Sequence, residues 1–371
     1  MKQVLGIVVS LLLLGAVVAG GYLSYRDKQL TTPTLSQAAQ QAIPANKVRL
    51  LTGSAKFAFL RDPALTAILA KEGIALDLTK SGAFANDVAK VEEFDAIWPA
   101  GINAANDFAA AFKGRASTYP VFSTPLAIAS WKALLPVLEK NGLAQASGPN
   151  HGDFLLDKAL PLMLAAKRWN QLAGNEVFNV NKGLLINTPD LRKSNTGALY
   201  IAALAYIKNG NEVPQTLEKS ATLALELAPL ITRQGYQEET LAGPFEDYIG
   251  QGMGKAPLVL IYESQFVEAK RDGRLRPEHI LLYPQPGMLL KHVLVAANPA
   301  GKRLGELLAQ NPEIQKIAAK YGFRTNNPDI FTTEMQGLGL DAPALLNLVD
   351  TPSSALFDNM TQTIIKKLEG N

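Results

Sequence analysis

The sequence predicts an α/β fold of two lobes joined by a two-strand hinge, preceded by an N-terminal transmembrane helix or signal segment. Three observations predict it. Short apolar strands alternate with helical segments over residues 47–112, which is typical of parallel β–α–β units. Two long extended runs, Tyr119–Ser130 and Ile280–Pro299, bracket a helix-rich stretch and would connect the lobes. Residues 1–28 contain a long uncharged run.

Length and composition are those of a globular chain. At 371 residues the chain can form two lobes that each bury a core. Hydrophobic residues make up 47% and charged residues 19%, which excludes a disordered chain. The net charge is +3 and no basic run exceeds two residues, so we expect no nucleic-acid partner. The absence of cysteine excludes thiol chemistry, disulfides and the lipid-attachment cysteine of a bacterial lipoprotein.

Residues 1–28 are predicted to be a membrane anchor or a signal. Val4–Tyr25 is an uncharged run of 22 residues, longer than the core of a cleavable signal, and it suits a membrane-spanning helix. Val17-Val18-Ala19 before Gly20 also fits a cleavage site, so a cleaved signal and release into the periplasm stay the alternative. Nearly balanced flanking charges leave the orientation open. Either way we expect the large domain outside the cytoplasmic membrane, on the periplasmic or extracellular side.

The first lobe follows a polar, proline-interrupted linker over residues 29–46. Apolar runs predict three strands, at residues 47–52, 74–78 and 94–98. The stretches after them predict helices at residues 63–71, 84–91 and 102–112. Asp62 before Pro63 is a self-capped helix start, so that helix end needs no ligand.

The two extended runs would enter and leave an inserted second lobe. Between them the sequence predicts strands at residues 183–186 and 256–262, and helices at residues 131–141, 153–172, 195–208, 217–231 and 263–271. After the return come helices at residues 302–310, 313–321 and 354–368. The chain therefore divides into a first lobe of residues 47–124 and 285–371 and a second lobe of residues 125–284.

The segment Gly183–Gly210 reads as a strand, a polar turn and a long apolar helix whose start is unusual. Ser194 or Asn195 is a good N-cap, but the first turn has none of the acidic residues usually enriched there. A helix N-terminus carries unpaired N–H groups and a partial positive charge, so this end could receive an anion. The alternative is that water and the capping side chain satisfy these groups.

Enzyme signatures are absent from the sequence. There is no Gly-x-Ser-x-Gly elbow and no His-Glu-x-x-His zinc helix. His151, His279 and His292 are scattered and lack carboxylates at ligand-like spacing, so we predict no metal and no cofactor. The glycine-rich stretch 250–255 precedes its strand, whereas a phosphate loop follows one.

Six strand-to-helix loops carry small polar residues instead. In an open α/β sheet, ligands collect at the carboxyl ends of the strands, where such loops lie. One loop alone is more simply a connection, but together they indicate a cleft lined by hydroxyls and backbone N–H groups. The candidate ligand-binding residues are Ser54, Ser81, Trp98, Ser123, Thr124, Ser194, Asn195, Thr196, Gly197 and Glu263.

These stretches resemble type II periplasmic solute-binding proteins of the phosphate-, sulfate- and molybdate-binding kind. The resemblance rests on VRLLTGSAKFAFL, FDAIWPAG, YPVFSTPLAIAS, RKSNTGALYIAALAYI, GKAPLVLIYESQ and PEIQKIAAKYGFR, and it spans residues 47–325. It implies two α/β lobes, two crossover strands forming a hinge, and closure around a solute. In that family Ser/Thr hydroxyls and helix N-termini hold oxyanions, which matches the serine, threonine, asparagine and glycine positions above. The membrane anchor, the missing lipoprotein cysteine and the chain beyond Arg324 depart from the family pattern.

We therefore expect an extracytoplasmic solute-binding protein that captures a small anionic solute by hinge closure, with an ABC-type permease as the candidate partner. One alternative is a membrane-tethered sensor or assembly subunit that uses the same fold. The other is a hydrolase or transferase that uses the cleft, for which Glu263 would be the only acidic residue in the candidate loops.

Overall fold

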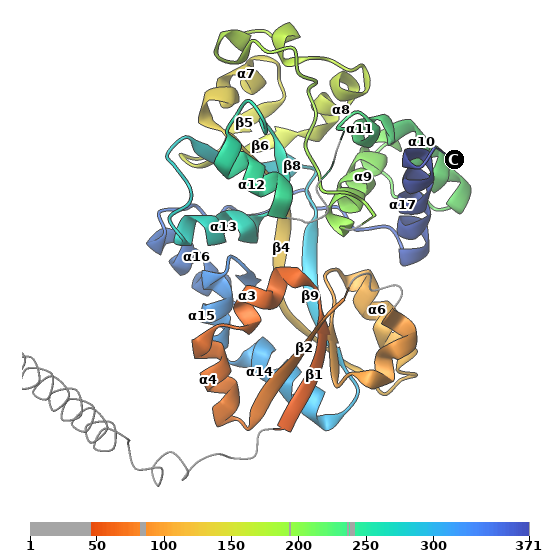
Figure 1. The fold of residues 1–371 in the computed structure, drawn as a ribbon, viewed down its shortest axis with the longest axis vertical. Coiled ribbons are helices and arrows are strands. Elements are labelled where there is room, and N and C mark those ends of the chain that lie inside the picture. Colours follow the sequence, from red (N-terminus) through yellow and green to blue (C-terminus); the bar gives the residue numbers. More distant parts are fainter. Residues whose placement is uncertain (1–45, 82–86, 193, 236, 238–241, 371) are drawn as a thin grey trace, which may run out of the picture. The chain divides into compact units, whose positions relative to one another are not determined.

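The computed structural model describes residues 46–81, 87–192, 194–235, 237 and 242–370. The predicted membrane segment, residues 1–28, and the predicted linker, residues 29–46, lie outside this part, except that Asn46 begins the first strand. Within the described residues, no helix combines the length and the apolar character needed to cross a membrane. Residues 47–371 form one compact unit (Figure 1).

A mixed sheet forms the centre of the first lobe. Strand β1 (Asn46–Thr52) runs parallel to β3 (Ala96–Trp98), and the order continues β2-β1-β3-β9-β4, with β2 at Ile74–Lys80. Alternate residues of the strands enter two apolar clusters: Leu50 and Leu294 face one side, Leu51 and Val295 the other. The helices are α3 (Phe57–Leu60), α4 (Pro63–Lys71), α6 (Ile102–Ala111), α14 (Pro299–Gln310) and α15 (Pro312–Lys320).

Two long strands connect the lobes. Residues 117–125 of β4 (Ser117–Trp131) pair with β9 (Leu289–Ala296), and residues 126–131 pair with β7 and β8 of the second lobe. Figure 1 shows β4 and β9 running side by side between the lobes. The chain therefore passes between lobes at about residues 125 and 289.

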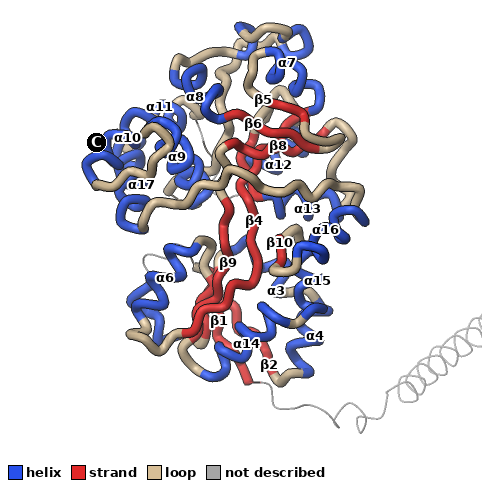
Figure 2. Tube along the Cα trace, turned by 180° about the vertical axis from the view of Figure 1, so that it is seen from behind, coloured by secondary structure: helices blue, strands red, loops and turns tan. Residues whose placement is uncertain are grey.

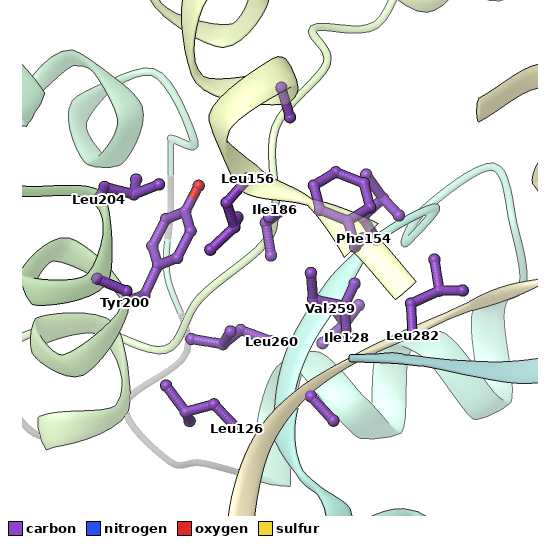
Figure 3. Packing of buried hydrophobic residues seen from close by; sticks show 14 of the residues in the cluster. Leu126, Ile128, Phe154, Leu156, Ile186, Tyr200, Leu204, Val259, Leu260 and Leu282 are labelled. Carbon is purple, nitrogen blue, oxygen red and sulfur yellow. The ribbon is translucent and has the colours of Figure 1, made fainter. Parts of the chain in front are cut away.

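The second lobe is built around strands β5 (Ala144–Ala146), β6 (His151–Leu155), β7 (Val259–Tyr262) and β8 (His279–Gln285). Its helices are α7 (Leu135–Lys140), α8 (Leu156–Leu164), α9 (Asn195–Lys208), α10 (Leu217–Leu227), α11 (Pro229–Thr232), α12 (Ala242–Gln251) and α13 (Glu263–Arg271). Figure 3 shows Tyr200 and Leu204 of α9 facing Ile186, Leu156 and the strand residue Leu260. The apolar helix thus supplies core on the sheet face it covers.

The C-terminal segment links the two lobes. After β10 (Arg324–Thr325) and α16 (Pro328–Gly337), residues 338–353 cross over β4 and β9, and Gly287 N donates to Asn347 O at 3.0 Å (Figure 2). Asn103 of α6 donates to Thr351 Oγ1 at 2.9 Å. Helix α17 (Ser354–Leu368) then packs on α10. Its predicted place in the first lobe is therefore wrong, because Met360 and Ile364 belong to the second-lobe core.

Helices with strong terminal signals form as predicted. Asp62 caps α4 by accepting from the backbone N–H groups of residues 64 and 65. Helices α13 and α17 have the predicted bounds, and Ser194 is the N-cap of α9. The remaining predicted division, with residues 47–124 in the first lobe and residues 125–284 in the second, stays a prediction.

Four predicted elements are wrong in part. Residues 153–155 belong to strand β6, which pairs with β8, and α8 already ends at Leu164, where Ala166 has a positive φ and Lys167 N bonds Leu162 O. Residues 183–188 form two isolated bridges and no regular strand. The run 280–299 is two strands with a turn at Pro286, which has no N–H for the ladder. Residues 88–93 are 3₁₀-helical, and residues 82–86 lie outside the described part.

Candidate functional site at the lobe junction

The carboxyl ends of the first-lobe strands lie together beside the crossover. Ser81 N donates to Thr52 O at 3.0 Å, and Thr52 Oγ1 donates to Trp98 O at 3.0 Å. Gly101 N donates to Lys291 O at 3.1 Å. Lys291 is the register partner of Ser123 on β4. The loops that begin at residues 53, 81 and 99 therefore open at one edge, level with residue 123.

The second lobe places the hydroxyls of Thr196 and Tyr262 beside β4, three residues beyond Ser123. Leu126 pairs with Tyr262, and the Thr196 hydroxyl donates to the Tyr262 hydroxyl at 3.2 Å. Ser264 N donates to Thr124 Oγ1 at 3.4 Å. At a rise of ~3.3 Å per residue, residues 123 and 126 lie about 10 Å apart along the strand. Loops of both lobes thus meet within the span of a small solute.

The start of α9 supplies Ser194 and Thr196 to this group of hydroxyls. Ser194 Oγ accepts from Thr196 N at 3.3 Å, and the first turn carries no acidic residue. Arg192 does not supply a free cation here, because it bonds the buried Asp190 at 3.0 Å through Nε. Thr196 is buried, and the side chain of Asn195 lies outside the described part. Burial raises the pKa of the Tyr262 hydroxyl to about 12, so at neutral pH it stays protonated and can donate.

Gly197 fits the first turn of α9 only because it lacks a side chain. A Cβ there would lie 2.7 Å from Leu191 Cδ1 and 3.2 Å from Pro189 O. We expect Gly197→Ala to destabilise the protein by about 1–3 kcal/mol, because the buried Leu191 side chain must move and the added methyl group crowds Pro189 O. Urea unfolding followed by circular dichroism measures this. Gly250→Ala is the control, since its Cβ would meet nothing within 4 Å, and equal unfolding midpoints for the two variants would contradict the prediction.

The first-lobe candidates differ in what their side chains already contact. Ser54 is exposed, while the Ser81 hydroxyl donates to Asp87 Oδ2 at 2.6 Å. Trp98 is buried and its Nε1 has no partner within the described residues. Ser123 is half-buried and Thr124 buried at the crossover. Ser54 and Ser123 are thus the most accessible hydroxyls among the first-lobe candidates.

Glu263 is held by protein groups. Its Oε2 accepts from Arg324 Nε at 2.6 Å, and its Oε1 accepts from Arg324 Nη2 at 2.7 Å and from the Tyr283 hydroxyl at 2.5 Å. Burial alone would lower the pKa of Arg324, but the adjacent carboxylate raises it above the ordinary arginine value. Burial and Glu263 together raise the pKa of Tyr283. Both carboxylate oxygens of Glu263 therefore already accept hydrogen bonds from protein groups in this conformation.

Lys56 is a residue that sequence reasoning missed. Its ammonium is completely buried 3.3 Å from His292 Nδ1 and 5.5 Å from the Trp98 ring centre. Burial lowers the pKa of Lys56 to about 7, and burial with the neighbouring lysine lowers the pKa of His292 well below its usual value. Lys56 stands two residues after the candidate Ser54, but nothing in the neighbouring sequence indicates that this lysine will be buried. Within the described residues, no cluster of three or more His, Asp or Glu side chains could hold a metal ion.

Comparisons with known proteins identify the fold. No protein-family model and no curated protein sequence matches this chain. The ABC substrate-binding protein Lmo0181 from Listeria monocytogenes, in complex with cycloalternan, is similar at a TM-score of 0.54 and 12% identity, over 88% of this chain and 94% of that chain. An ABC transporter structure from Clostridium perfringens ATCC 13124 gives 0.53 and 13%, over 86% and 98%. The Atu4243-GABA receptor gives 0.52 and 13%, over 87% and 98%.

At these identities the likeness shows the fold alone. It confirms a mixed α/β fold of two lobes, as in type II periplasmic solute-binding proteins. The kind of solute does not follow from it. The chain has the two-lobed α/β fold of the type II periplasmic binding proteins.

Proposed function

We propose that this chain is an extracytoplasmic solute-binding protein that captures a small anionic solute between its lobes by hinge closure, for delivery to an ABC-type membrane permease. One observation carries the proposal. Loops from both lobes meet beside a stretch of β4 that is about 10 Å long, between residues 123 and 126. Two crossover strands are few enough to bend, and closure would exclude water from the solute.

The anionic character of the solute rests on the start of α9. An N-terminus with no acidic residue in its first turn favours negative charge, and nearby hydroxyls such as that of Ser194 can donate to an oxyanion. The similar proteins differ in their ligands, since Lmo0181 is in complex with cycloalternan and Atu4243 is a GABA receptor, so the fold does not select the solute. Phosphate, sulfate and molybdate are therefore the first anions to test, and the site would use no cofactor.

Location follows from the same proposal. An N-terminal segment that anchors the chain, or a signal that is cleaved, would place the two lobes in the periplasm or at the extracellular side. A permease partner would then bind the protein when its lobes are closed. The C-terminal segment supports a second candidate, a membrane-tethered sensor or assembly subunit, because its contacts to Asn103 and to α10 tie both lobes together.

A thermal-shift screen of the purified full chain in detergent tests the solute class. Oxyanions, amino acids and sugars are each added, and a ligand at a hundred times its Kd should stabilise the folded state by about 2.7 kcal/mol. We expect phosphate, sulfate or molybdate to raise the melting temperature, with chloride at equal ionic strength as the control. A shift with sugars or amino acids alone would overturn the anion claim and keep solute binding. No shift with any solute would favour the sensor or assembly role.

A further inference from the structure

A pocket lies entirely within the second lobe, apart from the candidate residues of the lobe junction. Its volume is about 530 Å³, and it is bounded by the end of α8, the extended segment 181–188, the end of α11, and α12. None of the ten candidate residues at the lobe junction lines it. A volume of this size holds a molecule as large as a sugar or a small organic acid.

Positive charge dominates the described lining. Five cationic side chains face one carboxylate: Lys167, Arg168, Lys182, Arg233 and Lys255 against Asp247. Asp247 lies 3.4 Å from Lys255 and is the only carboxylate that pairs with any of the five among the described residues.

Backbone carbonyls, which carry no full charge, hold three of the other cations. Arg168 donates to Asn181 O at 3.0 Å, Arg233 to Leu164 O at 3.0 Å and Lys182 to Lys255 O at 2.6 Å. Burial, followed by repulsion from Lys255, lowers the pKa of Lys182. In the described part of the chain, the Lys167 ammonium makes no hydrogen bond. Among the described residues, the carboxylate of Asp247 is therefore outnumbered by the cations of this lining, and a bound anion would relieve the excess positive charge.

The rest of the lining restricts the kind of anion. Asn181 and Asn187 offer amide groups that can bond hydroxyls or carbonyls, and no aromatic side chain lines the described part of the pocket. A nucleobase would find no stacking partner there. We propose that this pocket binds a small non-aromatic molecule that carries two or more negative charges on phosphate or carboxylate groups.

Calorimetric titration of the full chain in detergent tests the proposal, with fructose 1,6-bisphosphate and citrate as the probes and fructose as the uncharged control. We expect at least one of the two probes to bind at a single site at low salt and weaken with added salt, while fructose does not bind. The two probes separate a preference for phosphate from one for carboxylate. Binding of neither probe would overturn the proposal.

Two variants locate the site. Lys167→Gln removes a charge that makes no hydrogen bond in the described part, so the fold should persist, and Lys167→Gln with Lys182→Gln should weaken binding at least tenfold. The control pair Lys71→Gln with Lys219→Gln removes two exposed charges elsewhere, and it should leave affinity within about twofold. Equal losses in both pairs would show unspecific attraction and overturn the proposal. Ser194→Asp, which targets the lobe junction, should leave this binding unchanged, and a loss there would also contradict a separate site.

Discussion

Glu263→Gln is expected to lower the free energy of unfolding by about 3–5 kcal/mol, because it leaves the Arg324 guanidinium in a buried site without its carboxylate. The Arg324 side chain is 16% exposed and that of Glu263 2%, so water can replace the lost partner only in part. The Tyr283 hydroxyl also loses a charged acceptor. Denaturant unfolding of wild type and variant, followed by circular dichroism, measures the loss.

The matched control is Glu313→Gln, which removes an exposed carboxylate 3.0 Å from Lys316 and should cost less than about 1 kcal/mol. The double variant Glu263→Gln with Arg324→Gln should lose less than the two single variants together, because their side chains interact directly. If Glu263→Gln cost no more than Glu313→Gln, the buried pair would not stabilise the junction between β10 and α13.

Lys56 is expected to make stability depend on pH between about 7 and 10.5. Its pKa is about 7 in the folded protein and 10.5 in an ordinary environment, so the unfolded chain holds a proton that the folded protein lacks across this window. The free energy of unfolding should therefore rise with pH, by up to ~1.4 kcal/mol per unit and about 5 kcal/mol in total. Below pH 7 both states are protonated, and the penalty of the buried charge is at its largest.

Lys56→Met isolates this contribution, since other groups titrate as well. At pH 7 the variant should be more stable than wild type, and the difference should shrink as pH approaches 10.5. Lys71→Met, at an exposed position of α4, should show no such convergence. Parallel pH profiles for wild type and Lys56→Met between pH 7 and 10 would contradict the assignment of a lowered pKa.

The elements that the sequence predicts well have local signals. Helix α4 follows from Asp62-Pro63, and most of β4 follows from the extended run Tyr119–Ser130, which continues through Pro120 and Pro125. Strand β6 has no such local signal, because Asp153 resembles a helix cap. Only pairing with β8, far along the chain, makes this segment extended. Long-range pairing overrides local preference at such positions.

In the candidate site, too, the features with local signals are predicted and those that depend on distant residues are not. Ser194 as the N-cap of α9 depends on neighbours one turn away and is confirmed. The partner of Glu263 lies 61 residues farther along the chain, so the sequence shows an acidic residue in a loop but not the ion pair that occupies it. Burial of Lys56 likewise depends on Trp98 and His292, which the fold alone brings to it. The ligand role of all ten candidates stays a prediction.

Ser194→Asp most directly tests the central claim that an anion binds between the lobes at the start of α9. Aspartate is as good an N-cap as serine, so the fold should persist, but its charge should repel a bound anion. Thr216→Asp makes the corresponding change at the N-cap of α10 and is the control. Calorimetric titration of the full chain with phosphate, sulfate and molybdate is run on proteins that also carry Lys167→Gln and Lys182→Gln, so that the second-lobe pocket does not contribute. One site is expected in this background alone and with Thr216→Asp, and at least tenfold weaker binding with Ser194→Asp. Equal affinity in all three proteins would contradict the claim.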